Sequence, residues 1–251
     1  MHLLADPITL LLAMLAVIVL GLAKGGFSGL GALATPLLAL ALPPVTAAAL
    51  LLPILLVQDV VGVWSYRHSW SGWIVGWMLP GAALGVALAA LFAASVPEAK
   101  VLLLLGVITT AFGAYRLWAE RGGRIAAPSS SPGWVGTLFG LACGVSSQIA
   151  HAGGPPFQMW VTPRKLPHET FVGTSAITFA AINWMKVPSY LLLGSLSREV
   201  LTAAMLLLPL AVAATCAGVW LVRRIDSARF YSLIYALMMA LGLQLVWQGW
   251  A

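Results

Sequence analysis

Charged residues are scarce in this chain of 251 residues. It holds 13 lysines and arginines and 7 aspartates and glutamates, 8% of the sequence, whereas 61% of the residues are hydrophobic. A water-soluble domain carries about 25% charged residues, so a soluble globular enzyme and a disordered chain are excluded. The basic residues form no single stripe or helical face, which argues against nucleic-acid binding. The composition predicts an all-α integral membrane protein.

Cysteine is nearly absent as well. Cys143 and Cys216 both lie in apolar runs and are interpreted as small buried hydrophobes, with neither a disulfide nor a metal site indicated. No GxxxxGK[ST] phosphate-binding motif occurs, which argues against an ATP-driven pump, and no cofactor is expected. The apolar N-terminus lacks a positively charged start and a clean cleavage site, so we predict a retained membrane segment.

Six apolar segments are long enough to cross a membrane as helices, for which about 20 residues are needed. They are residues 45–66, 73–94, 99–118, 169–193, 200–222 and 228–247. Two further apolar stretches, 8–42 and 134–162, are interrupted by glycines and prolines. Broken backbone at membrane depth is tolerated only inside protein or beside a water-filled cavity. We therefore predict two broken helical hairpins, giving eight membrane segments, or 10 helices if both arms of each hairpin are counted.

The two halves of the chain align with each other on either side of a polar linker. Five matches fall in order: Pro36 with Pro156, residues 59–66 with 183–190, 78–80 with 207–209, 98–100 with 227–229, and Gly113 and Trp118 with Gly242 and Trp247. Each half crosses the membrane an odd number of times. We therefore predict two inverted repeats, residues 1–119 and 134–251, joined by a cytoplasmic linker, 120–133. Inverted repeats with broken helices are typical of secondary transporters.

The placement of the basic residues predicts the orientation. With the N-terminus outside, nine of them face the cytoplasm: Arg67, Arg116, Arg121, Arg124, Arg164, Lys165, Arg223, Arg224 and Arg229. Only Lys100 and Arg198 face the other side. Because basic residues favour the cytoplasmic side, we expect both termini outside the cell (inner) membrane.

Each hairpin break carries a glycine-rich motif. The first is Lys24-Gly25-Gly26 with Gly29 and Gly31, and the second is Ala152-Gly153-Gly154-Pro155-Pro156. Together with the duplication and the length, these motifs resemble the TauE/SafE family, the sulfite exporter-type transmembrane permeases, over essentially the whole chain. The resemblance implies export of sulfite or of an organosulfonate such as sulfoacetate. The sequence departs from the family pattern at Lys24 and at His151-Ala152.

Three ionisable residues lie at membrane depth, where they are costly and usually face a cavity or a partner. Lys24 would attract an anion at the first break, or it would snorkel to an interface. Lys186 lies three residues after Asn183 on nearly the same helical face, so the two would offer a cation and an amide to an anion. The alternative for Lys186 is an ion pair with Asp59. Asp59 is the candidate proton carrier, or a structural partner for a lysine.

Polar groups at the breaks complete the candidate binding site. They are Ser28 in the first hairpin and Ser146, Ser147, Gln148, His151, Gly153 and Gly154 in the second. Hydroxyl, amide and imidazole groups beside close backbone amides suit an oxyanion. The alternative is that they only satisfy backbone groups freed by the break. Thr174, Ser175 and Thr178 either face the same cavity or bond to their own helix.

The sequence therefore predicts a secondary transporter, rather than an enzyme, that exports small sulfur-containing anions by alternating access. An uptake carrier or channel for another small organic or inorganic anion is the alternative, because the direction of transport is not visible in a sequence. A membrane enzyme using Cys143 or His151 is a third reading, but no acid or second histidine stands at a helical spacing from His151. The expected partners are a small anion, the lipid bilayer and a coupled proton, but no nucleic acid, and a homodimer is left open.

Overall fold

The computed structural model describes residues 2–26, 30–93, 96–120, 122, 128–222 and 228–250. Within these ranges the chain is helical, without β-strands, which confirms the all-α prediction. The α-helices are α1 (Pro7–Gly25), α2 (Ala34–Leu38), α3 (Pro44–Tyr66), α4 (Gly72–Ala93), α5 (Glu98–Glu120), α6 (Gly133–Ala150), α7 (Gly154–Val161), α8 (His168–Leu192), α9 (Arg198–Val222) and α10 (Ala228–Trp250). The short 3₁₀-helices are η1 (His2–Leu4), η2 (Leu30–Leu33) and η3 (Thr162–Arg164).

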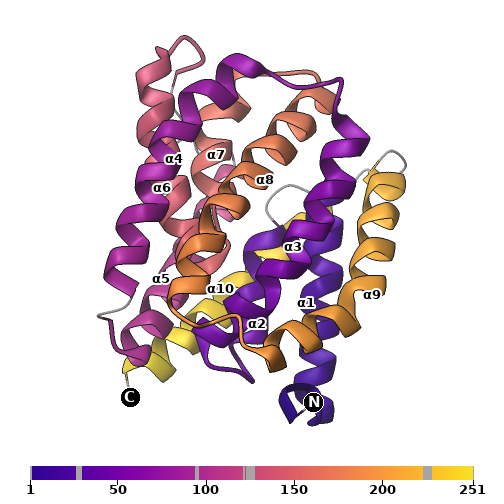
Figure 1. The fold of residues 1–251 in the computed structure, drawn as a ribbon. Coiled ribbons are helices and arrows are strands. Elements are labelled where there is room, and N and C mark those ends of the chain that lie inside the picture. Colours follow the sequence, from indigo (N-terminus) through magenta and orange to yellow (C-terminus); the bar gives the residue numbers. More distant parts are fainter. Residues whose placement is uncertain are drawn as a thin grey trace.

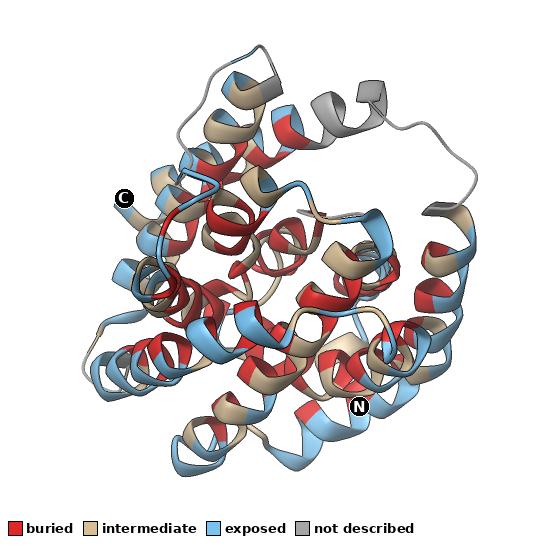
Figure 2. Ribbon diagram, turned by 90° about the horizontal axis from the view of Figure 1, so that it is seen from above, coloured by how far each residue is buried: buried red, intermediate tan, exposed pale blue. Residues whose placement is uncertain are grey.

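Five of the described helices are long and apolar enough to cross a membrane: α1, α3, α4, α5 and α9. Four of them coincide with predicted spans, and α8 and α10 are helical over the other two. Buried residues face the middle of the bundle, whereas exposed ones lie on its outer faces (Figure 2). Many of the exposed residues are large and apolar, including Leu192, Trp247 and Trp250. Such an apolar exterior is what a lipid-facing surface requires.

Both interrupted stretches form hairpins. Helix α1 is capped by Gly26, whose φ of 131° lies in the region that favours glycine. Helix α6 ends at His151, which is left-handed with φ 52° and ψ 24°. The amides of His151 and Ala152 bond back to the carbonyls of Ser147 and Ser146, closing the helix end. The chain returns through η2 and α2 in the first hairpin, and through α7 and η3 in the second.

The two hairpins enter the bundle from opposite ends. In Figure 1, α1 begins and α2 ends at the end of the molecule that carries both termini. The second hairpin closes at the opposite end, where Arg164 donates to the backbone carbonyls of Ser129 and Ser131 beside the start of α6. Each hairpin therefore enters and leaves on its own side, and the two breaks meet inside the bundle.

The helices pair across the midpoint of the chain. Helix α1 packs against α9, and α6 packs against α4. Helix α3 contacts α8, and α5 contacts α10. Helix α3 also contacts α9, and α8 also contacts α4. If the helices α1–α5 are matched in order with α6–α10, each of these contacts either maps onto itself or has a counterpart.

Glycines allow the paired helices to approach to backbone contact. A Cβ added at Gly25 of α1 would collide with the backbone of Gly218 in α9, and one added at Gly85 of α4 would collide with Leu141 in α6. Small residues are how helices associate in lipid, where the hydrophobic effect gives no preference for helix over lipid contact. These tight pairs form a scaffold around the two breaks.

Candidate functional site

Three helices meet at a buried carboxylate in the middle of the bundle. Lys24, in the last turn of α1, forms an ion pair with Asp59 of α3. Asn183 of α8 donates from Nδ2 to the other carboxylate oxygen, Oδ2, at 2.6 Å. Asp59 is 2% exposed and Lys24 is 12% exposed. Lys24 therefore does not snorkel to the membrane surface, and Lys24 rather than Lys186 is the direct partner of Asp59.

Lys186 forms a second polar cluster on the next turn of α8. Its side chain is fully buried. Its Nζ lies 3.2 Å from both the carbonyl oxygen and the hydroxyl of Ser147, and 2.6 Å from Nδ1 of His151. His151 Nε2 lies 2.9 Å from the carbonyl oxygen of Ala48, which can only accept, so Nε2 carries a hydrogen. With a protonated Lys186 and a neutral imidazole, Nδ1 is the acceptor for the ammonium and every contact is satisfied.

The charges of the two clusters do not balance. Asp59 already faces Lys24, and the structure records no carboxylate within ion-pair distance of Lys186 among the residues it describes. A buried charge without a counterion is strongly destabilising. With both lysines protonated, the site holds one positive charge in excess, which a bound anion would neutralise.

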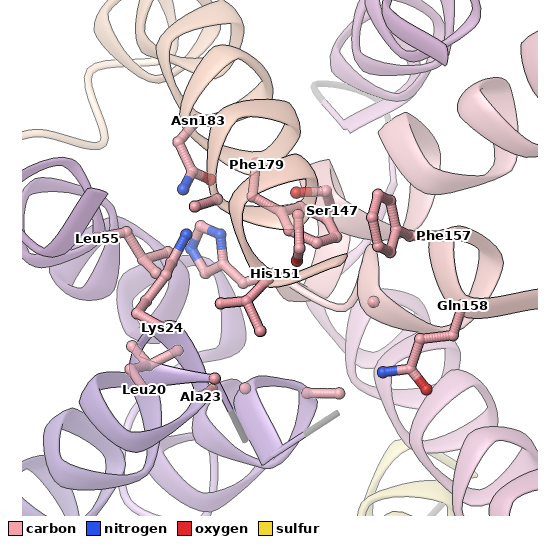
Figure 3. Close-up of a pocket in the computed structure, with 17 residues that line it drawn as sticks. Leu20, Ala23, Lys24, Leu55, Ser147, His151, Phe157, Gln158, Phe179 and Asn183 are labelled. Carbon is pink, nitrogen blue, oxygen red and sulfur yellow. The ribbon is translucent and has the colours of Figure 1, made fainter. Parts of the chain in front are cut away.

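A cavity of about 80 Å³ lies against these clusters, between the two hairpins and α8 (Figure 3). The first hairpin and α3 contribute Leu20, Ala23, Lys24, Gly26, Gly31, Ala32 and Leu55 to its wall. The second hairpin contributes Ser147, His151, Gly154, Phe157 and Gln158. Helix α8 contributes Val172, Ser175, Ala176, Phe179 and Asn183. The wall is therefore mainly apolar, with a few polar groups directed at a space suited to a small molecule.

The cavity reaches from one end of the bundle to its middle. Along α8 it extends from Val172 to Asn183, about 16 Å at 1.5 Å per residue. Val172 lies one turn from the start of α8, at the same end as Arg164. The cavity thus leads from the end with the basic residues to the buried carboxylate.

A second cavity, of about 370 Å³, lies toward the end of the bundle that carries the termini. Its wall includes Ala48, Gln148, Tyr190 and Ser195. The His151 side chain stands between the two cavities, because it lines the first one, bonds to Ala48, and stacks on Tyr190 at 6.3 Å between ring centroids. The last turn of α6 belongs to the same partition, since Ser147 faces the first cavity and Gln148 the second.

The structure brings together five of the residues predicted from the sequence. Lys24, Ser147, His151, Gly154 and Asn183 all line the first cavity. Asp59 and Lys186 lie directly behind this wall, bonded to residues that form it. Lys186 therefore acts on the cavity through His151 and Ser147 and does not itself line it.

Four other predicted residues are not placed on this cavity. The hydroxyl of Ser146 donates to the carbonyl of Ala142 in its own helix at 2.8 Å, as expected from backbone satisfaction alone. The Gln148 amide donates to Ser189 at 2.9 Å and faces the second cavity. Gly153 is packed away from the space, and Ser28 lies outside the described residues.

The two adjacent glycines of the second break have different surroundings. A Cβ at Gly153 would lie 2.9 Å from both Cys143 Sγ and Phe179 Cε1. The buried Cys143 thiol donates to the Gly153 carbonyl at 3.1 Å and does not line the cavity, so its role here is packing. A Cβ at Gly154 would meet nothing within 4 Å. Gly153 is thus required for close packing, whereas Gly154 keeps the cavity open.

Sequence reasoning missed part of the wall. Phe179 was not predicted, although it lies four residues from both Ser175 and Asn183 and so shares their face of α8. Of the three hydroxyl residues for which the sequence left a place on the cavity open, Ser175 lines it. Thr174 and Thr178 donate to their own helix instead, at 2.6 and 2.7 Å. No sequence pattern around Gln158 predicted that it lies on the cavity wall. Among the described residues, no group of three or more histidines, cysteines or acids gathers as a metal site would.

Comparison with known families decides the affiliation. The chain matches the family described as Sulfite exporter TauE/SafE over residues 13–245. The protein belongs to the TauE/SafE family. This confirms the resemblance found in the sequence and makes the chain a member of a family of multi-pass membrane transporters. The match includes the second hairpin, the first hairpin from residue 13 onward, and every residue on the cavity wall of the TauE/SafE chain. No curated protein and no solved structure gives a significant match.

Proposed function

We propose that this TauE/SafE protein is a secondary transporter that exports small sulfur-containing anions, sulfite or an organosulfonate such as sulfoacetate, across the inner membrane. The observation that carries the proposal is the cavity between the two hairpins, which is lined by Lys24 and has Asp59 and Lys186 directly behind its wall. An anion entering it would complete the charge balance of the site.

The polar groups on the wall suit an oxyanion. Lys24 supplies a cation, and Ser147 and Ser175 supply hydroxyls that can donate to sulfite or sulfonate oxygens. An unpaired Asp59 carboxylate would repel an anion. Here one of its oxygens is paired with Lys24 and the other accepts a hydrogen bond from Asn183. A protonated Lys186 would add positive charge from behind the wall through its contact with His151.

The two cavities support an alternating-access mechanism. They lie toward opposite ends of the bundle and are separated at His151, so moving the last turn of α6 would open one cavity to the other. By the positive-inside rule, the end that carries Arg67, Arg164 and Lys165 faces the cytoplasm. The first cavity would then receive anions from the cytoplasm, and both termini would lie outside.

Two tyrosines support the proposal that the halves are inverted repeats. Tyr66 donates to the carbonyl of Gly25 at 3.0 Å, at the broken end of α1. Tyr190, its predicted repeat mate, donates to the carbonyl of Gln148 at 3.2 Å, at the broken end of α6. Each half thus uses the same residue to hold a carbonyl that the break leaves without a helical partner.

The first test is ligand-dependent thermal stability of the detergent-purified protein. The anions to compare at matched ionic strength are sulfite, sulfate, thiosulfate, sulfoacetate, taurine, phosphate and small carboxylates. A ligand at about 100 times its Kd should stabilise the fold by about 2.7 kcal/mol. We expect selective stabilisation by sulfite or a sulfonate, lost in Lys24→Gln and in Lys186→Ala but kept in Lys100→Gln, which removes an exposed lysine far along the chain. Stabilisation by carboxylates alone would contradict the proposed substrate.

The second test is efflux of the stabilising anion from proteoliposomes. An exporter using alternating access should show saturable efflux and counterflow. The alternative function, an uptake carrier or channel for another small anion, would show a different preferred anion, or flux without saturation and counterflow.

A further inference from the structure

The side chain of Gln158 enters the first cavity from α7, on the opposite side from Lys24 (Figure 3). It is only 5% exposed. Its oxygen, Oε1, accepts a hydrogen bond from Arg116 Nη1 of α5 at 2.9 Å. The amide nitrogen points toward the other residues of the wall, and the structure records no acceptor for it among the residues it describes.

The orientation of this amide follows from the chemistry of its partner. A guanidinium group has only donors, so the side of the glutamine that faces Arg116 must be the oxygen. The NH₂ group of Gln158 is then forced to the other side, toward the cavity. Arg116 is itself held in place, because its guanidinium lies 4.8 Å from the ring of Tyr235 in α10.

We propose that Gln158 is a donor to the transported anion and that Arg116 is the positioning residue that directs the Gln158 amide nitrogen into the cavity. The inference rests on the proposed function, because it assigns a further binding residue to the same site. The ligand chemistry required is an anion with an acceptor oxygen on the side facing α7. Arg116 also polarises the amide, since a hydrogen bond to its carbonyl strengthens the donor at the nitrogen.

The test compares anion affinity in the detergent-purified full-length protein by isothermal titration calorimetry, with sulfite and sulfoacetate as probes. Gln158→Glu keeps the acceptor for Arg116 but replaces the donor with a carboxylate oxygen. Gln158→Met removes both donor and charge at similar volume. We expect at least about a tenfold loss of affinity in Gln158→Met, since a hydrogen bond to a charged group contributes that much, and a larger loss in Gln158→Glu.

The positioning role of Arg116 is tested by a double-mutant cycle. Arg116→Gln lets the amide rotate, so it should weaken binding in the parent protein and have no further effect in the Gln158→Met background. A role in folding alone would lower the melting temperature equally in both backgrounds and leave affinity unchanged. Arg67→Gln is the matched control, because it removes an exposed cation that donates to the carbonyl of Trp64 and lies over its ring, away from the cavity wall.

The outcomes separate this inference from the proposed function. If the parent protein binds neither anion, the proposed function fails. If the parent binds an anion and both variants, Gln158→Met and Gln158→Glu, bind it as tightly as the parent does, the inference is wrong while the proposed function stands. An additive effect of Arg116→Gln in the cycle would overturn the positioning role. Melting curves of each variant show that any loss of affinity comes from a folded protein.

Discussion

Asn183 donates a hydrogen bond to Asp59 at 2.6 Å, and the alignment predicted from the sequence places the two residues at equivalent positions in the two halves of the chain. Equivalent residues of two halves related by a two-fold axis can touch only close to that axis. The contact therefore supports an axis that passes through the site. The pair is chemically unequal, an acid in one half and an amide in the other, so the predicted repeats would enclose a single site with one carboxylate.

Asp59 is the candidate proton carrier, and Asp59→Asn should uncouple transport from protons. Protonation of Asp59 would release Lys24 from its ion pair and strengthen the pull on an anion, a change that an asparagine cannot undergo. We expect anion efflux from proteoliposomes that responds to an imposed pH gradient in the parent and is insensitive to it in the variant. Glu169→Gln, an exposed acid at the start of α8, serves as control. A full gradient response in Asp59→Asn would rule out this role.

The two glycines of the second break should respond differently to alanine. Gly153→Ala places a methyl group 2.9 Å from Cys143 and Phe179, so we expect a stability loss of about 1–3 kcal/mol from overpacking. Gly154→Ala projects into open space and should leave stability nearly unchanged while narrowing the cavity and weakening anion binding. Thermal melts and calorimetric titration of both variants check this. Equal melting temperatures would mean that the packing around Gly153 is looser than observed.

Lys186 and His151 should behave as a coupled pair. His151→Leu leaves a buried amine with one acceptor fewer, and we expect it to cost about 1–3 kcal/mol, as the loss of a hydrogen-bond partner by a buried polar group does. Lys186→Met combined with His151→Leu should cost less than the two single changes together. The measurement is the melting temperature across the full double-mutant cycle. Strict additivity would contradict the observed contact of 2.6 Å.

Tyr66→Phe and Tyr190→Phe should weaken the two hairpins to a similar extent. Each variant loses one hydrogen bond to a carbonyl at the broken end of a helix, about 1 kcal/mol. Hydrogen exchange, followed by mass spectrometry of peptides from α1 and α6, should show faster opening only in the hairpin whose tyrosine was changed. Faster exchange in both hairpins after either change would show that the tyrosines do not act within their own halves.

The sequence by itself determined the membrane fold, the spans, the two breaks and the family. These features are local. Runs of apolar residues have to be helical in lipid because every backbone group must be satisfied internally. Clustered glycines and prolines break a helix, whereas single prolines such as Pro53 and Pro80 lie within continuous helices. The residues around the breaks, Lys24, Ser147, His151 and Gly154, could therefore be identified as parts of a site before their contacts were known.

Only the tertiary structure decided which side chains meet. A helix that is apolar on all sides gives no signal of its inward face, since lipid is as apolar as the protein interior. The sequence could not tell that Asp59 pairs with Lys24 rather than Lys186, or that Gln148 turns away from the cavity while Gln158 enters it. These choices depend on helices far apart in the chain, and packing alone brings them together.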